Sequence, residues 1–163
     1  MQIKLSDADQ EAVSAQLGRP VRNAMSVVAR CACGEPLVIQ TAPRLSDGQP
    51  FPTLFYLTCP AAISAIGTLE SEGSMSQYES QLSLDPELRA SYVMAHRDYL
   101  TRRAAIAEVG EIANISVGGM PNRVKCLHAL AAHALAVGPG INTIGDDVVA
   151  RITPWCHQES KCR

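Results

Sequence analysis

The chain has 163 residues, a length typical of one compact domain that buries its own core. Its 14 basic and 16 acidic side chains leave a net charge of −2, which excludes the basic surface that non-specific nucleic-acid binding requires. Because 47% of the residues are hydrophobic and 18% are charged, the composition also excludes a disordered chain.

The N-terminus and the apolar stretches bear on where the protein resides. Residues 1–7 contain no charged leader followed by an apolar run, so we expect no secretory signal. The longest apolar candidate, residues 127–137, is shorter than the roughly 18 residues that cross a bilayer. We therefore predict a cytoplasmic protein without membrane insertion. In a reducing cytoplasm the six cysteines are expected to be thiols or metal ligands rather than disulfides.

The first third of the chain predicts one helix and three strands. Ser6 is placed to cap a helix over residues 9–17, which Gly18 ends. The β-branched runs at 25–30 and 36–41 predict two strands around a tight turn. A proline-containing loop over residues 42–52 then leads to a third strand at 53–58.

The remainder of the chain predicts helices, over residues 61–71, 74–82, 85–108 and 121–137, with a last short helix from residue 146. Asp85 and Pro86 mark the start of the long helix, as a cap and a first-turn proline. We predict an α+β fold, with a small antiparallel sheet in the N-terminal third packed against a helical C-terminal two-thirds. The single domain, residues 1–163, divides into a β-rich cysteine-containing part (1–60), a helical part (61–150) and a tail (151–163).

Four cysteines are predicted to form one metal site. Cys31 and Cys33 lie at the predicted strand turn, Cys59 ends the third strand, and Cys126 lies in the first turns of the helix from residue 121. If that helix packs across the strand ends, four thiolates converge on one ion, as in Cys₄ zinc sites. The one-residue gap between the first two is shorter than zinc pairs usually have, and a Cys-Pro pair also occurs beside iron–sulfur ligands. The predicted cofactor is therefore zinc or an iron–sulfur cluster.

A simpler interpretation is that these cysteines are buried small hydrophobic residues. The tail adds Cys156 and Cys162, which could supply or replace a ligand. Because chain ends fray, we interpret Cys156 as a solvent-exposed residue.

Histidines on the helix from residue 121 are the candidate acids, bases or ligands. Cys126 and His133 share a helix face but lie about 10.5 Å apart along its axis, too far for a Cys/His nucleophile within this helix. His128 is the candidate catalytic residue. The alternative is a packing role, which is common for a lone helical histidine.

The loop before this helix predicts an anion-binding pocket. Gly118 and Gly119 precede the predicted helix start, with Arg123 and Lys125 in its first turn. Free amides and the helix dipole favour negative charge there, and Arg44 from the proline-containing loop is the expected further contact. The expected ligand is a phosphate-like or carboxylate anion. The alternatives are an ordinary tight loop and an ion pair at Arg44.

Five blocks of the sequence resemble a known family, and they lie at residues 30–36, 41–54, 56–60, 118–121 and 123–128. They are similar to the uncharacterised actinobacterial family called domain of unknown function five-hundred-and-one. The resemblance implies a cytoplasmic protein in which Cys31, Cys33, Cys59 and Cys126 are motif cysteines. The resemblance also implies that the gene for this protein lies near genes for a septum-formation initiator, enolase and an exopolyphosphatase. Such a neighbourhood would associate the protein with cell division or phosphate metabolism.

Three functions are consistent with the sequence. The first is a metal-centred protein with a four-cysteine site beside the anion-binding pocket, in which a fully thiolate-bound zinc would be structural. The second is a non-enzymatic adaptor of a cell-division or envelope pathway that carries a structural metal. The third is a metal-free thiol enzyme or redox sensor that uses Cys31 and Cys33. Whether the protein is an enzyme is left open.

Overall fold

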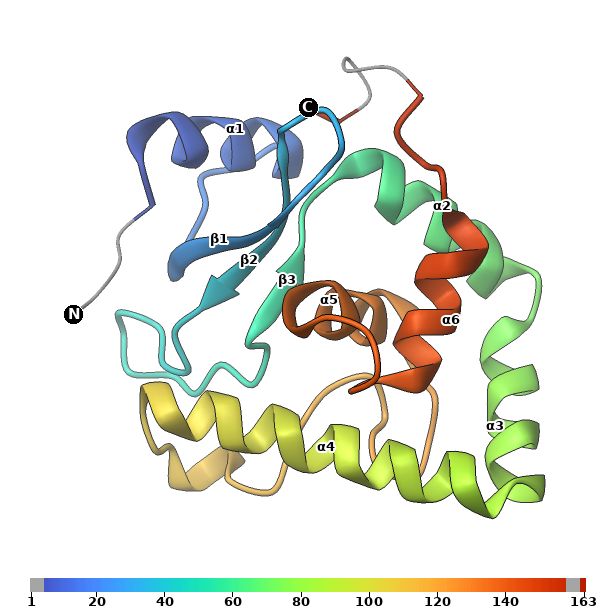
Figure 1. Ribbon diagram of the computed structural model, residues 1–163. Helices are drawn as coiled ribbons and strands as arrows, with labels where there is room; N and C mark the ends of the chain where they lie inside the picture. The colour runs from blue at the N-terminus through green and yellow to red at the C-terminus, as the bar shows by residue number, and fades with distance from the viewer. Residues whose placement is uncertain (1–4, 158–161) are drawn as a thin grey trace.

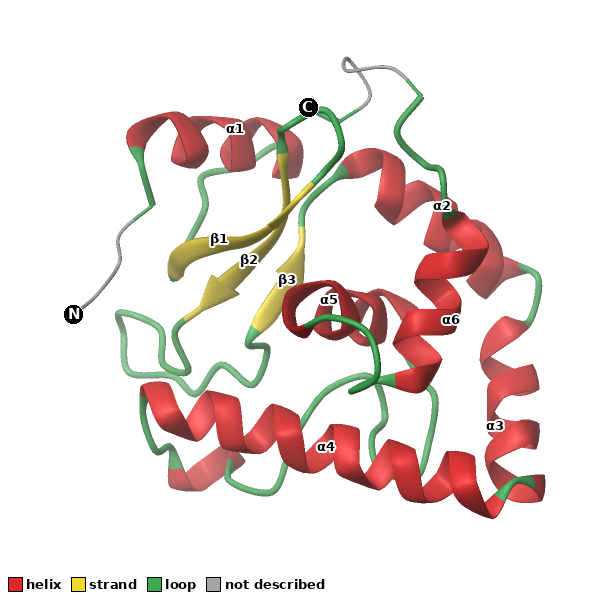
Figure 2. Cartoon of the chain, viewed as in Figure 1, coloured by secondary structure: helices red, strands yellow, loops and turns green. Residues whose placement is uncertain are grey.

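The computed structural model describes residues 5–157 and 162–163. Three antiparallel strands form a sheet in the order β1-β2-β3, from β1 (Ala24–Arg30), β2 (Pro36–Thr41) and β3 (Phe55–Leu57) (Figure 2). Val27 pairs with Ile39, and Val38 pairs with Leu57, so β2 is the central strand. Helix α1 (Asp7–Leu17) packs against β2, and the side chain of Ser6 caps it by accepting a hydrogen bond from Asp9 N–H.

The helical part follows the sheet and confirms the predicted α+β class. Its elements are α2 (Pro60–Ser71), α3 (Ser74–Leu84), α4 (Pro86–Ile106), the short 3₁₀ helix η1 (Gly110–Ile112), α5 (Leu127–Val137) and α6 (Thr143–Ile152). Asp85 caps α4 by accepting hydrogen bonds from two backbone amides, as predicted from the Asp-Pro pair.

Helix α5 is the centre of the molecule (Figure 1). It packs against β3, α2 and α6. Its sequence is apolar around most of the helix, which is typical of a helix buried on several sides. The buried residues are Leu127, Leu130, Ala131, Ala132, His133 and Ala134.

Two predicted helix starts are wrong. Helix α5 begins at Leu127 rather than residue 121, because the chain before it closes a loop: Arg123 N–H donates to Gly119 C=O and Lys125 N–H donates to Gly118 C=O, both at 2.8 Å. Helix α6 begins at Thr143 rather than residue 146, because the side chain of Asn142 accepts a hydrogen bond from Gly145 N–H and caps it there.

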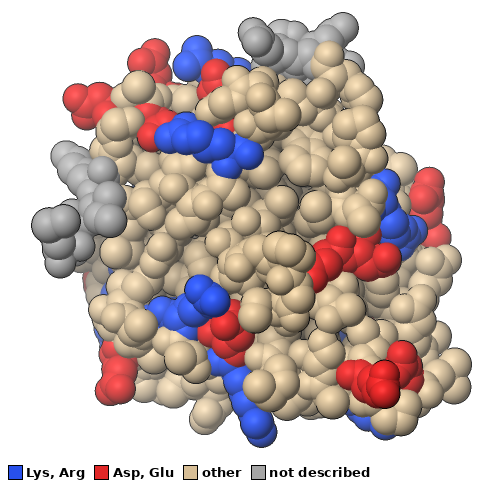
Figure 3. All heavy atoms as spheres, in the orientation of Figure 1, with Lys and Arg blue, Asp and Glu red and all other residues tan. Residues whose placement is uncertain are grey.

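The tail returns to the sheet end of the molecule. Figure 1 shows the C-terminus beside the turn that joins β1 to β2, close to the end of α1. On the face shown in Figure 3, basic and acidic side chains lie in small mixed groups separated by wide uncharged areas. None of the helices in the described part of the chain combines the length and the apolar character that a membrane span needs.

Candidate metal centre

A tight turn presents two cysteines at the end of the β1–β2 hairpin. Gly34 N–H donates to Cys31 C=O at 2.9 Å, and Cys31 N–H donates to Glu35 C=O at 2.9 Å. Gly34 has φ of 91°, a left-handed conformation that glycine adopts without strain. The Cys-x-Cys-Gly sequence therefore folds into a closed turn that carries the side chains of Cys31 and Cys33.

The tail brings two more cysteines to this turn. The sulfur of Cys162 lies 3.6 Å from that of Cys31 and 3.7 Å from that of Cys156. Gln16 of α1 holds the tail by donating hydrogen bonds to Cys162 C=O at 2.5 Å and to Pro36 C=O at 2.8 Å. The sulfurs of Cys31, Cys33, Cys156 and Cys162 all lie within 4.8 Å of one another. We call these four residues the thiol cluster.

The spacing of the thiol cluster matches one tetrahedral ion. Four sulfurs at about 2.3 Å from a single zinc lie about 3.8 Å from one another. Two of the sulfur–sulfur separations, 3.6 and 3.7 Å, are close to that value, and all of them are within 4.8 Å. They are well beyond the roughly 2.05 Å of a disulfide bond, and all six cysteines carry free thiols.

The electrostatics of the thiol cluster favour a thiolate at Cys31. Burial opposes its ionisation, but the backbone N–H of Cys33 and the thiols of Cys156 and Cys162 donate hydrogen bonds that lower the pKa of Cys31 to about 7. Burial raises the pKa of Cys162, and a thiolate at Cys31 raises it further. Cys31 therefore ionises more readily than Cys156 or Cys162, whose pKa values are raised.

Of the four cysteines predicted as ligands, the structure places Cys31 and Cys33 in the thiol cluster and leaves Cys59 and Cys126 out of it. Cys59 is the N-cap residue of α2, is fully buried, and interacts with the thiol of Cys162. Cys126 is the N-cap residue of α5. The interpretation of Cys156 as an exposed tail residue is wrong, because it is half-buried against its partner thiols.

The sequence analysis named Cys156 and Cys162 as residues that could supply or replace a ligand, but it did not place them beside Cys31 and Cys33. Cys156 and Cys162 are separated from the turn by more than 120 residues, so no local spacing rule connects them. The available signal was the pair itself: two cysteines close in sequence are well placed to complete a site that already contains Cys31 and Cys33.

Cys126 belongs to a second group of side chains, with Glu70 of α2 and His128 of α5. Ligand atoms of these three residues lie within 4.8 Å of one another. One oxygen of Glu70 accepts hydrogen bonds from Leu127 N–H at 2.8 Å and from His128 Nδ1 at 3.2 Å. Glu70 escaped the sequence analysis because a lone glutamate on a predicted helix carries no signal.

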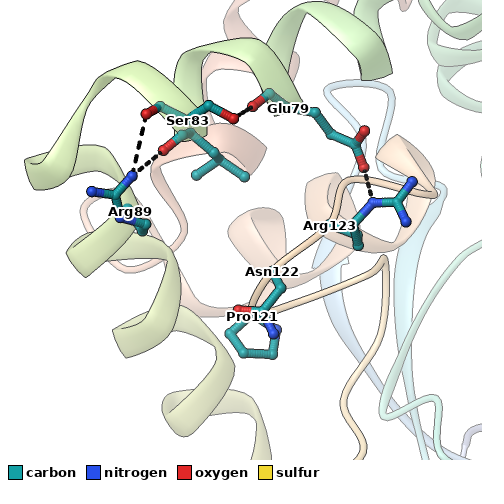
Figure 4. A pocket seen from close by; sticks show the side chains of 7 residues that line it. Glu79, Ser83, Arg89, Pro121, Asn122 and Arg123 are labelled. Atoms are coloured by element: carbon teal, nitrogen blue, oxygen red, sulfur yellow. Dashed lines mark hydrogen bonds and ion pairs between the residues drawn. The ribbon is translucent and has the colours of Figure 1, made fainter.

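The two predicted arginines of the anion-binding pocket each contact a carboxylate. Arg44 pairs with Glu111 at 2.8 Å, and Arg123 pairs with Glu79 at 2.7 Å. Figure 4 shows Arg123 pointing toward Glu79, across a pocket of about 310 Å³ that also contains Arg89. Arg44 does not line this pocket.

The glycine loop has an internal role in the structure. A Cβ atom on Gly119 would lie 2.6 Å from Arg123 C=O, and one on Gly118 would lie 2.7 Å from the side chain of Leu130. The glycines are therefore required for close packing, and Lys125 beside them is exposed. Because α5 begins at Leu127, the loop is not at the helix N-terminus, and anion binding stays a prediction.

His133 is a buried packing residue rather than a member of either group. Its Nε2–H donates to Asp98 at 2.8 Å, and its Nδ1 accepts from Asn142 at 3.1 Å. Its ring stacks on Phe55, with 6.0 Å between centroids. Burial lowers the pKa of His133, so the neutral ring is favoured despite its hydrogen bond with Asp98.

Comparison with known proteins identifies a family but no characterised relative. The family described as "Protein of unknown function (DUF501)" matches residues 27–150. The matched region contains Cys31, Cys33, Cys59 and Cys126, whereas Cys156 and Cys162 follow its end. No curated protein matches the chain, and no solved structure matches it.

Proposed function

The chain belongs to the DUF501 family of proteins of unknown function, and we propose that it binds one zinc ion through Cys31, Cys33, Cys156 and Cys162. The observation that carries this proposal is the mutual approach of four free thiols to within 4.8 Å. These thiols come from a hairpin turn and from the tail, so the ion would join two segments that are distant in the sequence.

The geometry supports a single ion over an iron–sulfur cluster. In a four-iron cluster each thiolate binds a different iron, so the sulfurs stand apart by the width of the cluster. The thiol cluster is too compact for that arrangement, with sulfurs 3.6 and 3.7 Å apart. Zinc is the common ion for four thiolates in tetrahedral geometry.

A zinc ion with four thiolate ligands has a structural role. All four coordination positions are filled, so no position is left for water or substrate. The ion would hold the tail against the β1–β2 turn, where Gln16 and the ion pair of Arg163 with Glu35 at 3.2 Å already contact it. This proposal agrees with the first function considered from the sequence, a metal-centred protein, and gives the metal a structural role without catalysis.

Metal analysis of four proteins tests the proposal. We expect one zinc per chain in the wild type and in Cys126→Ser, because Cys126 lies outside the thiol cluster. We expect Cys156→Ser and Cys162→Ser to lose most of the zinc, because three thiolates bind it more weakly. Inductively coupled plasma mass spectrometry of the freshly purified proteins measures the content.

Two results would contradict the proposal. Iron with inorganic sulfide in the wild type would identify a cluster. Zinc that is kept by both tail variants and lost by Cys126→Ser would support the ligand set predicted from the sequence in place of the thiol cluster.

A further inference from the structure

The start of α5 carries a second group of metal-ligand side chains, outside the thiol cluster. The group consists of Glu70, Cys126 and His128, and we call it the mixed-ligand group. Cys126 and His128 also line a pocket of about 330 Å³ between α1, β3, α2 and α5. A carboxylate, a thiol and an imidazole therefore meet at the edge of a cavity.

The distances within the mixed-ligand group fit ligands that share one ion. One oxygen of Glu70 lies 3.2 Å from Nδ1 of His128. A direct hydrogen bond between a charged donor and a carboxylate is shorter, at about 2.7 to 2.9 Å. An oxygen and a nitrogen that each bind a tetrahedral zinc at about 2.0 to 2.1 Å lie about 3.3 Å apart. The ligand atoms of all three residues lie within 4.8 Å of one another.

The ring of His128 has the orientation of a metal ligand. Its Nε2 lies 3.0 Å from Ile63 C=O, which can only accept a hydrogen bond, so Nε2 carries a proton. Metal-binding histidines commonly donate their second ring N–H to a carbonyl or carboxylate in this way, which fixes the tautomer and the ring. The other nitrogen, Nδ1, faces the carboxylate of Glu70. In the metal-free protein a proton on Nδ1 bridges the two groups, and a bound ion replaces that proton.

The carboxylate of Glu70 is held in place by the backbone of α5. Leu127 N–H donates to the same Glu70 oxygen at 2.8 Å. A carboxylate oxygen has a second lone pair, and this one is directed to the side of His128. Glu70 therefore has both a backbone contact that orients it and a remaining electron pair for an ion.

The sulfur of Cys126 completes the group. Cys126 is the N-cap residue of α5, but its side chain makes no capping hydrogen bond. Its thiolate alone would be opposed by the nearby carboxylate of Glu70, because like charges disfavour ionisation. A divalent cation between the two groups removes this repulsion, and a coordinating thiol is deprotonated by the ion.

We propose that Glu70, Cys126 and His128 bind a second divalent metal ion, with one coordination position open to the pocket. A thiolate and an imidazole favour zinc or cobalt over magnesium or calcium. Three protein ligands with an open fourth position are typical of catalytic zinc sites, whereas four thiolates are typical of structural ones. Two of the three ligands line the pocket, so a molecule in the pocket reaches the fourth position.

The second ion is expected to be held less tightly than the first. The mixed-ligand group has three protein ligands and a single thiolate, whereas the thiol cluster has four thiolates. Freshly purified protein is therefore expected to keep only the zinc of the thiol cluster, and added metal fills the second site. The two sites share no residue, so neither proposal depends on the other.

The walls of the pocket define the class of molecule that the open position takes. Phe55, Leu57 and Ile63 present aromatic and aliphatic surface. A charged group would lose its hydration against these walls. The expected ligand is a small molecule with one nitrogen or oxygen donor for the metal and a neutral apolar body for the pocket.

Titration of the full-length, zinc-loaded protein with Co²⁺ tests the second site. We expect one added Co²⁺ per chain, with the intense visible bands of a tetrahedral ion and a thiolate-to-cobalt charge-transfer band. Mass spectrometric metal analysis after the titration is expected to find the original zinc still present. Cys126→Ser should lose the charge-transfer band, and Glu70→Gln and His128→Gln should weaken Co²⁺ binding by more than about a hundredfold, since loss of a supporting contact alone costs 10 to 100-fold.

Two matched variants control for the loss of a carboxylate or a histidine. Glu72→Gln changes an exposed carboxylate just after α2, and His96→Gln changes a histidine that contacts Ser116. Both are expected to bind Co²⁺ as the wild type does. Circular dichroism and the zinc content of the thiol cluster establish that each variant is folded.

A pair of metal-binding probes tests whether the open position faces the pocket. Imidazole and 4-phenylimidazole offer the same donor nitrogen to Co²⁺, but the second carries an apolar ring. We expect 4-phenylimidazole to shift the visible bands at about tenfold lower concentration, because the pocket buries its phenyl group.

Three results would overturn the proposal. The first is a Co²⁺ uptake that releases an equal amount of zinc, which would place the ion in the thiol cluster. The second is Co²⁺ binding of wild-type strength in folded Cys126→Ser and His128→Gln. The third is an equal effect of the two imidazoles, which would separate the metal from the pocket. Loss of zinc from the purified protein would contradict the thiol cluster and leave these readouts unchanged.

Discussion

At the scale of single residues, buried polar side chains hold the loops to the helices. Arg103 of α4 is 3% exposed and donates to three backbone carbonyls, those of Pro52, Ile112 and Ile115, at 2.7, 2.5 and 2.6 Å. Tyr99 lies one turn before Arg103 and also holds this loop, because its hydroxyl oxygen accepts a hydrogen bond from Leu54 N–H at 2.6 Å. These contacts attach the segment before β3 and the segment around η1 to one face of α4.

Arg103→Met is expected to destabilise the fold by about 3 kcal/mol, because three buried carbonyls lose a charged donor. Arg102→Met is the matched control. Arg102 pairs with Asp98 on the surface, so its loss is expected to cost about 0.5 kcal/mol. Urea denaturation followed by circular dichroism measures both values, and equal losses in the two variants would contradict the role of Arg103.

The protonation of His128 makes a prediction about pH. Its pKa in the folded chain, about 9, exceeds the ordinary histidine value of about 6.5. The charged ring therefore stabilises the fold fully below pH 6.5, and this contribution declines as the pH rises through 9. The free energy of unfolding of the wild type should exceed that of His128→Gln at pH 6.5, and the difference should narrow at pH 9.5. Urea titrations at the two pH values measure it, and a difference that widens with pH would contradict the assignment.

At the scale of elements, α5 and α6 approach each other closely at Gly145. A Cβ atom on Gly145 of α6 would lie 2.2 Å from Leu130 C=O and 2.9 Å from the Cβ of Ala134. Glycine at this position lets the two helices pack backbone to backbone, which keeps α6 over the buried face of α5.

Gly145→Ala is expected to destabilise the fold by about 2 to 3 kcal/mol, because the added methyl group forces the helices apart. Gly67→Ala in α2 is the matched control. Nothing lies within 4 Å of a Cβ there, so the better helix propensity of alanine should stabilise by about 0.5 kcal/mol. Thermal unfolding of both variants tests the pair, and a Gly145→Ala variant as stable as the wild type would show that the helices can separate without cost.

Elements with strong local signals could be predicted from the sequence. Ser6 before α1 and Asp85-Pro86 before α4 are capping signals, and the structure confirms both. The start of α5 was wrong because Pro121 is typical of a first helical turn, while the hydrogen bonds of Gly118 and Gly119 close a loop there instead. That choice depends on the packing of Gly118 against Leu130, which no local pattern reveals.

At the scale of the whole molecule, the tail closes onto the first hairpin. Arg163 pairs with Glu35, and Cys162 lies beside Cys31, so the end of the chain contacts the turn near its beginning. The sequence was sufficient to predict that Cys31 and Cys33 lie together in the thiol cluster, because both lie in one turn. The other half depends on where the described tail residues, 153–157 and 162–163, pack after α6, and this is a property of the folded molecule.

Removal of the proposed zinc ion is expected to destabilise the whole fold and to loosen the tail first. A ligand present at one hundred times its Kd adds about 2.7 kcal/mol to stability, and a chelator removes this contribution. Hydrogen exchange should accelerate at residues 153–157 and in the turn at residues 31–35, and less so in α4. Mass spectrometry with and without chelator measures this exchange, and equal acceleration in all three segments would contradict a local role of the ion.

X-ray absorption spectroscopy at the zinc edge tests the central claim most directly, because it counts the atoms bound to the ion. The thiol cluster predicts one shell of four sulfurs at about 2.3 Å, with no nitrogen or oxygen, in the wild type and in Cys126→Ser alike. A shell that contains nitrogen or oxygen, as Glu70, Cys126 and His128 would supply, or a neighbouring metal atom, would contradict a single zinc held by Cys31, Cys33, Cys156 and Cys162.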